Sequence, residues 1–265
     1  MRKLDKKPNI LVIGDLMIDH YLWGTCDRIS PEAPVQVVNV KKESSVLGGA
    51  GNVINNLFAL GANVDVISVV GDDLVANELK DLFDNINVSR NGLIVEKNRK
   101  TSKKSRLIAS QQQVLRYDME SIDDISSQSC DEILGKLKKD IKKYDSIILS
   151  DYGKGVLTSS LTKEIIKLAN ENKVKVLADP KGKDYSKYKG AYTLTPNKKE
   201  AIEATNIDIK DEESLIKALK SLQDTCELEL ALITLSEQGI AIFDDSLRIK
   251  PTVAREVYDV TGAGD

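Results

Sequence analysis

NILVIGD, residues Asn9–Asp15, is the stretch that decides the fold. An uninterrupted apolar run closed by glycine and aspartate is typical of a strand buried on both faces of a parallel sheet. Similar runs follow at residues 63–73, 145–153, 174–182, 191–197 and 231–239. The segments between them have helical spacing, as at Val53, Leu57 and Leu60. This alternation predicts an α/β fold, with a mostly parallel central sheet between two layers of helices.

Two segments, residues 33–46 and 92–118, break this alternation. In both, apolar residues alternate with polar ones and Lys, Arg and Gln are frequent, which is typical of half-exposed antiparallel strands. We therefore expect one small flanking sheet, inserted into a single domain that spans residues 1–265.

The charge balance argues against a protein that binds nucleic acid through a basic surface. The 265 residues include 38 Lys and Arg against 41 Asp and Glu, a formal net charge of -3. The sequence contains no run of about 18 apolar residues and no signal-peptide pattern at the N-terminus. We therefore expect a cytoplasmic protein with no membrane partner.

Cysteine and histidine are too scarce for several kinds of site. The chain has three cysteines, Cys26, Cys130 and Cys226, far apart in sequence, and a single histidine, His20. A zinc site of Cys and His ligands is therefore disfavoured. A Ser-His-Asp or Cys-His mechanism would have to use His20, which has no nucleophile signature near it. The chemistry is expected to rest on carboxylates, lysines, arginines and backbone amides.

Polar residues repeatedly follow the predicted strands. In a parallel sheet the carboxyl ends of the strands share one edge, where ligands bind. Each residue taken singly is also a common turn former, so both readings stay open. The strand-end candidates are Asp15, Asp19, Asp151, Lys154, Asp179, Lys181, Asn197 and Glu200.

The glycine-rich turns indicate which phosphate-containing ligands the chain could bind. The GGAGN turn at residues 48–52 does not fit GxGxxG, and no segment fits GxxxxGK[ST], which argues against a dinucleotide fold and a P-loop NTPase. In the DVTGAGD segment at residues 259–265, three small residues would let backbone N–H groups approach a phosphate. The aspartate that follows them could accept a proton from a hydroxyl.

Through the GGAGN turn, the TPNKKE segment at residues 195–200 and the DVTGAGD signature, the chain resembles the ribokinase-like (PfkB) carbohydrate kinases. RISPEAP at residues 28–34 and QQQVLRYD at residues 111–118 further resemble the D-glycero-β-D-manno-heptose-7-phosphate kinases. The resemblance runs from Asn9 to Asp265. It implies a three-layer α/β/α sandwich whose small β-sheet lid comprises segments 33–46 and 92–118.

The activity that this resemblance implies is ATP-dependent phosphorylation of the anomeric hydroxyl of the heptose 7-phosphate to the 1,7-bisphosphate. This step belongs to ADP-heptose and lipopolysaccharide core biosynthesis. Such a transfer needs a base, donors for the developing charge, and Mg²⁺ on the phosphates of ATP. Residues implied for these tasks are Asp265 as the base, Gly262, Ala263 and Gly264 as the anion hole, and Asn197 and Glu200 as the NxxE pair that holds Mg²⁺ through water.

The remaining residues implied for ATP are Lys198, Lys199, Ser236 and Gly239. Asn197 also has the spacing of a helix N-cap, with Glu200 completing a capping box, and both interpretations can hold together.

The sugar site implied by the resemblance combines acceptors, glycines and cations. Carboxylate and amide groups suit adjacent hydroxyls, glycine permits close approach, and cations suit the 7-phosphate. For Lys104 and Arg106 a solvated basic face remains an equal alternative. The implied sugar residues are Asp15, Asp19, Gly48, Gly49, Asn52 and Asp151, and the implied phosphate residues are Lys104, Arg106, Arg116 and Lys181.

Partners implied by the resemblance are a second copy of the chain and a further catalytic domain. The edge strands of the lid need covering, which predicts a homodimer through the lid. Related kinases are often the N-terminal half of a bifunctional protein with an adenylyltransferase half. Because the sequence stops at Asp265, we expect a fragment that is C-terminally incomplete and binds ATP poorly as it stands.

Other functions remain open from the sequence. A kinase for another sugar phosphate uses the same fold and motifs. A non-catalytic module for sugar-phosphate binding or dimerisation would not need Asp265, Asn197 or Glu200. A dinucleotide-dependent redox enzyme is disfavoured because GxGxxG is absent.

Overall fold

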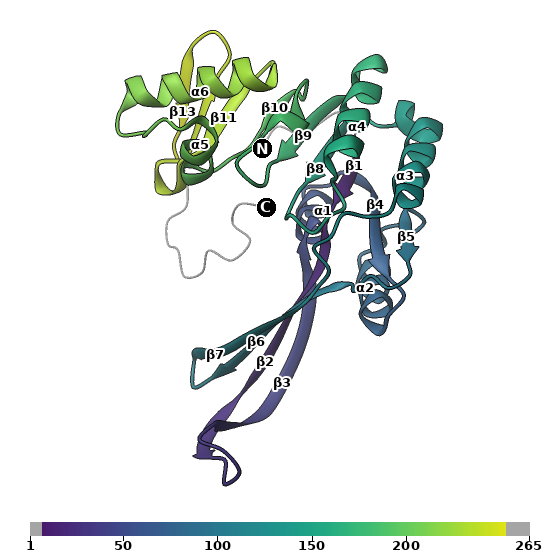
Figure 1. Ribbon diagram of the computed structural model, residues 1–265, viewed down its shortest axis with the longest axis vertical. Helices are drawn as coiled ribbons and strands as arrows, with labels where there is room; N and C mark the ends of the chain where they lie inside the picture. Colours follow the sequence, from purple (N-terminus) through teal and green to yellow (C-terminus); the bar gives the residue numbers. More distant parts are fainter. Residues whose placement is uncertain (1–6, 253–265) are drawn as a thin grey trace.

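The central layer of the molecule is a six-stranded sheet whose paired strands all run parallel (Figure 1). The computed structural model describes residues 7–252. The strand order is β10-β9-β8-β1-β4-β5, so β1, which contains NILVIG, lies inside the sheet as predicted. The strands are β1 (Asn9–Gly14), β4 (Asn63–Gly71), β5 (Leu93–Glu96), β8 (Ser146–Ser150), β9 (Lys175–Asp179) and β10 (Thr193–Leu194).

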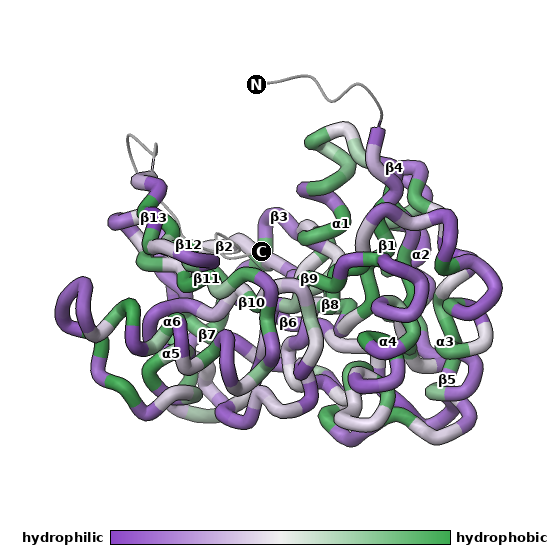
Figure 2. The backbone as a smooth tube through the Cα atoms, turned by 90° about the horizontal axis from the view of Figure 1, so that it is seen from above, coloured by the Kyte–Doolittle hydropathy of each residue, from purple (hydrophilic) through white to green (hydrophobic). Residues whose placement is uncertain are grey.

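Helices cover both faces of this sheet, which confirms the predicted three-layer α/β/α architecture. Alternate residues of β1 enter two separate hydrophobic cores, with Leu11 and Ile13 in one and Val12 in the other. The first core includes apolar residues of α3 and α4, and the second includes those of α1 and α2. Figure 2 shows hydrophobic segments along the inner strands and polar segments along the outer turns. The helices are α1 (Ala50–Ala59), α2 (Leu74–Asn85), α3 (Ser127–Asp140) and α4 (Ser159–Glu171), with 3-10 turns at Ile141–Lys143 and Ser186–Tyr188.

Side-chain caps explain where three of these helices begin. The side chains of Asp73, Ser126 and Thr158 each accept a hydrogen bond from the backbone N–H three residues later. Such a cap satisfies one of the free N–H groups of the first turn. Asp73 also accepts from the Thr101 amide at 2.8 Å, so the start of α2 is tied to the strand that leaves for the flanking sheet.

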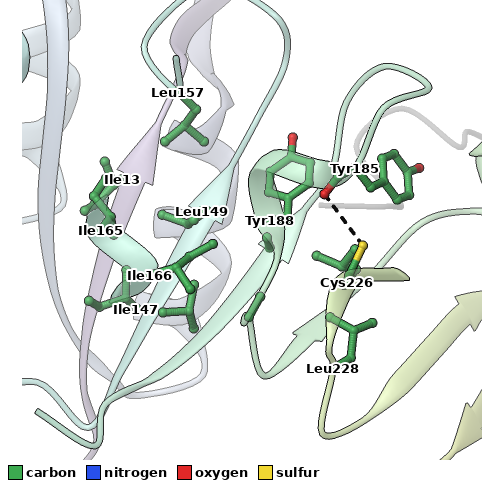
Figure 3. Close-up of a cluster of buried hydrophobic side chains, with 14 of the residues drawn as sticks. Ile13, Ile147, Leu149, Leu157, Ile165, Ile166, Tyr185, Tyr188, Cys226 and Leu228 are labelled. Carbon is green, nitrogen blue, oxygen red and sulfur yellow. Dashed lines mark hydrogen bonds between the residues drawn. The ribbon is translucent and has the colours of Figure 1, made fainter. Parts of the chain in front are cut away.

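The last described elements form a smaller unit beside β10. An antiparallel three-stranded sheet, β11-β12-β13, joins the central sheet through parallel bridges from Thr193 to Leu230 and from Asn197 to Thr234. In Figure 3, Tyr188, Cys226 and Leu228 lie where this unit meets the main core, and the Cys226 thiol donates to the Tyr185 carbonyl at 3.6 Å. The unit comprises α5 (Lys198–Thr205), α6 (Glu212–Cys226), β11 (Ala231–Thr234), the 3-10 turn Ser236–Gln238, β12 (Ile240–Phe243) and β13 (Leu247–Lys250).

A separate four-stranded sheet projects from the main body (Figure 1). We call it the flanking sheet. Its order is β3-β2-β6-β7; β2 runs antiparallel to β3 and parallel to β6, and β6 runs antiparallel to β7. The strands are β2 (Leu16–Ile29), β3 (Gln36–Gly49), β6 (Ser102–Ala109) and β7 (Gln112–Met119).

The flanking sheet differs from the expectation in three respects. It includes β2, although segment 16–29 was not assigned to it. Residues 93–96 instead form β5, which pairs with β4 in the central sheet. The β2–β6 contact is parallel, because the two hairpins enter the flanking sheet side by side from the same edge of the central sheet. Segments 33–46 and 92–118 therefore describe this sheet only in part.

The points of insertion place the flanking sheet at the ligand-binding edge. One hairpin, β2–β3, is inserted between β1 and α1, directly after the carboxyl end of β1. The other, β6–β7, follows β5. Because both insertions leave from carboxyl ends of parallel strands, the flanking sheet starts where ligands bind in such folds.

Candidate active site at the carboxyl edge of the sheet

The carboxyl ends of β1, β8 and β9 lie side by side. Gly14 pairs with Ser150, and Ser150 pairs with Asp179. Asp15 and Asp151 follow directly, so these strand-end residues share one edge, as predicted.

Asp15 acts inside the protein and is not exposed to a ligand. Its side chain is buried and accepts three backbone hydrogen bonds, from Tyr152 at 2.8 Å, Lys154 at 3.0 Å and Val156 at 3.1 Å. Burial raises the pKa of the Asp15 carboxyl, and the three N–H donors oppose that shift. The Asp15 side chain therefore holds the loop that follows β8, and the structure does not present it for the predicted contact with sugar hydroxyls.

Replacing Asp15 with asparagine is expected to destabilise the protein by about 2–4 kcal/mol, because the new NH₂ group would face N–H donors. Because the pKa of Asp15 is raised in the folded state, the wild-type protein also loses some stability as pH rises from the ordinary value of 3.8 through the folded value, and Asp15→Asn lacks this pH-dependent part. Urea unfolding of the Asp15→Asn variant at pH 7 measures the loss. Asp245→Asn, at an exposed site, is the matched control. Equal stability of the two variants would contradict this role.

Asp151 is likewise used internally. Its buried carboxylate accepts from the Gly153 amide at 2.8 Å, from the Lys187 ammonium at 2.5 Å and from the Tyr188 hydroxyl at 2.7 Å. These partners hold the turn after β8 against the Ser186–Tyr188 segment. Like Asp15, Asp151 presents no exposed carboxylate for the predicted contact with the sugar.

Asp19 and Arg106 form an ion pair on one face of the flanking sheet. Their N–O distance is 2.5 Å, and both side chains are less than one-fifth exposed. The Arg106 guanidinium also lies over the Tyr21 ring, 5.4 Å from its centroid. The alternative that Arg106 belongs to a solvated basic face is therefore wrong, because this cation is paired and largely covered.

Cations gather beside this pair on the same face. Lys104 is directly paired with Asp19 across β2 and β6, and with Asp118 across β6 and β7. Arg116 donates two hydrogen bonds to Asp118, at 2.9 and 2.6 Å. Burial lowers the pKa of the Lys104 ammonium, and repulsion by Lys154 and Arg116 lowers it further. Within residues 7–252, Lys104 has no carboxylate within ion-pair distance.

Lys154 was a strand-end candidate with no assigned task. Lys154 lies in the loop that Asp15 holds, and its ammonium is 2.6 Å from the carboxylate of Glu120, just after β7. It thereby connects the central domain with the cation-bearing face of the flanking sheet. Its place after a strand end was visible in the sequence, but its pairing with Glu120 was not.

The predicted glycines lie where β3 meets α1. A Cβ on Gly48 would stand 2.1 Å from the Asp19 carboxylate. Gly49 has φ 56°, a conformation that favours glycine, and it precedes the first turn of α1, which contains Asn52. Gly48, Gly49 and Asp19 are thus brought together, and Asn52 lies one helical turn away.

Asn197 and Glu200 form the capping box that their spacing predicts. The Asn197 side chain accepts from the Glu200 amide, and the Glu200 carboxylate accepts from the Asn197 amide, both at 3.0 Å. Lys181 lies beside this pair, with its ammonium 3.6 Å from Glu200. Lys181 is therefore placed with the NxxE pair and not with Lys104, contrary to its predicted grouping. Lys198 and Lys199 are exposed in the first turn of α5.

Two further predicted positions, Ser236 and Gly239, border the turn between β11 and β12. The Gly239 amide donates to the Ser236 carbonyl at 3.0 Å, and Gly239 has φ 96°. The predicted base and anion hole, residues 262–265, lie outside the described residues 7–252.

The surroundings of His20 and Cys226 indicate structural roles for both residues. His20 is buried between strands, with Nδ1 2.9 Å from the Ser105 hydroxyl and Nε2 2.7 Å from Glu43. Burial raises the pKa of the Cys226 thiol to about 11, so it is a poor nucleophile at neutral pH. Within residues 7–252, no cluster of three His, Cys, Asp or Glu side chains is arranged to hold a metal ion. None of the helices described is both long and apolar enough to cross a membrane.

Curated relatives match the chain almost from end to end. The bifunctional protein HldE of Aliarcobacter butzleri is 80% identical over 262 residues, which are 99% of this chain and 55% of the relative. The bifunctional protein HldE of Sulfurimonas denitrificans is 60% identical over 97% of this chain and 54% of its own length. The chain thus spans about half the length of these relatives.

A solved structure and a family model also match this chain. The structure of Arabidopsis thaliana ribokinase complexed with ribose and ATP superposes with a TM-score of 0.73 at 17% identity, covering 98% of this chain and 83% of that one. This likeness shows a ribokinase-like fold. The family model described as pfkB family carbohydrate kinase matches residues 7–265. The chain therefore belongs to the pfkB family of carbohydrate kinases.

Proposed function

We propose that this kinase transfers the γ-phosphoryl group of ATP to the anomeric hydroxyl of D-glycero-β-D-manno-heptose 7-phosphate, forming the 1,7-bisphosphate. The observation that carries the proposal is the group of four cations next to Asp19 at the carboxyl edge of the sheet. A carboxylate suits sugar hydroxyls, and clustered cations suit a phosphate that does not react. The name of the HldE relatives supports heptose as the sugar.

The charge balance of this face favours a phosphorylated sugar over a neutral one. Arg106, Arg116 and Lys154 each have a carboxylate partner, whereas Lys104 has none within residues 7–252. A partly buried, unpaired ammonium costs free energy that an anionic ligand would recover.

The nucleotide site is proposed at the NxxE pair and the DVTGAGD segment. Membership of the kinase family implies ATP as the phosphoryl donor. The capping box uses one Glu200 oxygen on the Asn197 amide and leaves the other near the Lys181 ammonium. This arrangement fits Mg²⁺ held through water, because Mg²⁺ keeps several waters and takes few protein ligands. Bound Mg²⁺ would neutralise charge on the phosphates.

In this proposal the predicted groups have distinct tasks. Asp265 takes the proton of the anomeric hydroxyl, and the amides of Gly262, Ala263 and Gly264 stabilise the charge that develops on the transferred phosphoryl group. Lys198, Lys199, Ser236 and Gly239 border the nucleotide. Lys181 is assigned to the phosphates of ATP, because it lies beside Glu200.

The names and lengths of the relatives support a proposal about the second domain. Because the curated HldE proteins are named bifunctional and this chain spans about half their length, we propose that the kinase works together with an adenylyltransferase domain. The pair would supply ADP-heptose for the lipopolysaccharide core. Its site of action would be the cytoplasm, where ATP is available.

A homodimer through the flanking sheet is also proposed. The face opposite Asp19 carries a continuous apolar strip, since Leu22, Leu107 and Leu115 are directly paired across β2, β6 and β7. Leu115 and Tyr117 are 53% and 50% exposed. A second copy would cover this strip and the edge strand β7.

Replacing Leu115 with aspartate is therefore expected to convert the dimer into a monomer, because a charge would be buried in the apolar strip. Sedimentation equilibrium of both proteins measures the mass. Ile249→Asp, an exposed position on β13 away from the flanking sheet, should remain dimeric. A wild-type protein that sediments as a monomer would exclude this contact.

The function itself is tested by ADP release from Mg-ATP in the full-length protein, with a panel of sugars and sugar phosphates. Release that depends on heptose 7-phosphate, with a bisphosphate product, is the expected result. Release with a different sugar phosphate would keep the reaction and replace the substrate. No release with any sugar would favour a binding module.

A further inference from the structure

Lys154 is rigidly placed by its backbone. Its N–H donates to Asp15 at 3.0 Å, and its carbonyl accepts from the Arg99 guanidinium. The neighbouring Gly155 has φ 86°, and a Cβ there would stand 2.0 Å from the Asp123 carbonyl oxygen. The loop can therefore take few other shapes, and the start of the Lys154 side chain is well defined.

The side chain leads from the central domain to the flanking sheet. Its ammonium lies 2.6 Å from Glu120, and both side chains are less than one-fifth exposed. The ammonium is also near enough to Lys104 and Asp118 to shift their pKa values. Lys154 thus joins the face that carries Asp19 and Arg106, although it belongs to another part of the chain.

The charged side chains on this face carry an excess of positive charge, which is electrostatically unfavourable without a bound anion. Four cations, Lys104, Arg106, Arg116 and Lys154, face three carboxylates, Asp19, Asp118 and Glu120. Like charges that are gathered and partly desolvated repel each other, and an added dianion relieves this repulsion.

We infer that Lys154, together with Lys104, binds the non-reacting phosphate of the sugar phosphate and selects phosphorylated sugars over neutral ones. This inference rests on the proposed function. Asp15 is the positioning residue, because it holds the Lys154 backbone without touching the ligand. Lys104 approaches the phosphate from the flanking sheet and Lys154 from the central domain, so binding of the substrate links the two.

The test is the preference of the enzyme for heptose 7-phosphate over unphosphorylated heptose, expressed as the ratio of the two kcat/KM values. Lys154→Met keeps the length of the side chain and removes its charge. It should lower this ratio about 10- to 100-fold, mainly through the KM for heptose 7-phosphate, with the KM for ATP unchanged. Lys154→Arg should keep most of the preference.

The matched control is Lys189→Met. Lys189 also pairs with a glutamate, Glu227 at 3.0 Å, but that pair is more than half exposed and neither residue belongs to the group of cations and carboxylates around Asp19. It should leave the preference unchanged. Glu120→Gln provides a second test should Lys154→Met prove unstable, because it releases the Lys154 ammonium and should lower the KM for heptose 7-phosphate.

The experiment distinguishes a failure of the role of Lys154 from a failure of the proposed function. Wild-type turnover with an unchanged preference in Lys154→Met would overturn the role of Lys154 alone. A raised KM in Glu120→Gln would also overturn it. Wild-type protein that turns over no sugar phosphate would overturn the proposed function and this inference with it.

Discussion

Replacing Asp265 with asparagine in the full-length protein is expected to lower kcat by about 10²-fold or more, with the KM values changed little. An amide cannot take the proton of the anomeric hydroxyl, whereas it keeps the shape and hydrogen-bonding size of the carboxylate. Steady-state ADP release with saturating heptose 7-phosphate and Mg-ATP measures the effect.

The pH dependence separates a base from a binding group. The acid limb of the kcat profile should disappear in Asp265→Asn if it reports ionisation of this carboxylate. Asp245→Asn, at an exposed position, should keep both the rate and the profile. An unchanged kcat in Asp265→Asn would remove this residue from the catalytic role.

Replacing Gly48 with alanine is expected to lower kcat/KM for heptose 7-phosphate by about 10²-fold, because the new methyl group displaces the carboxylate that is proposed to bind the sugar. The Cβ would lie 2.1 Å from one carboxylate oxygen of Asp19 and 2.9 Å from its Cγ. Arg106 holds the other oxygen at 2.5 Å, so Asp19 cannot simply turn away.

Two further variants isolate this effect. Gly135→Ala, on α3 with no atom within 4 Å of the new methyl group, should leave kcat/KM unchanged. In an Asp19→Ala background, Gly48→Ala should have little additional effect, because the two changes act on one contact. Full additivity of the two losses would contradict the proposed link.

Much of the fold was predictable because buried strands and amphipathic helices leave strong patterns. The run NILVIGD became the interior strand β1, and the later runs became β4, β8, β9, β10 and β11. The segment 191–197 was a weaker case, since Pro196 and Asn197 end the strand after two residues and start α5. The sequence did not indicate that β2 belongs to the flanking sheet. Its first residues are apolar and buried, as in a core strand, and only its far end is exposed.

The gathering of the candidate residues at one edge of the sheet was predictable, but the hydrogen-bond partners of each carboxylate were not. Asp15 and Asp151 directly follow β1 and β8, whereas Asp19 lies four residues further on, within β2, and nothing in their immediate sequence indicates the different tasks. The structure gives Asp15 three amide donors and Asp151 a lysine, a tyrosine and an amide, which leaves Asp19 as the carboxylate on the flanking sheet. Apart from the Gly153 amide, these partners lie far away in the sequence, from 36 positions for Lys187 with Asp151 to 141 for Val156 with Asp15, unlike the local capping box of Asn197.

The sequence by itself determined the layers, the edge at which the candidate residues gather and the family, because periodicity and short motifs are local properties of the chain. The tertiary structure alone decided which polar side chains are used internally and which remain for a ligand. Asp15 is buried under amides of the loop after β8, while Lys154 from that loop extends to Glu120 on the flanking sheet. Hydrogen bonds and ion pairs depend on distance in space, and only the folded chain brings such residues within reach.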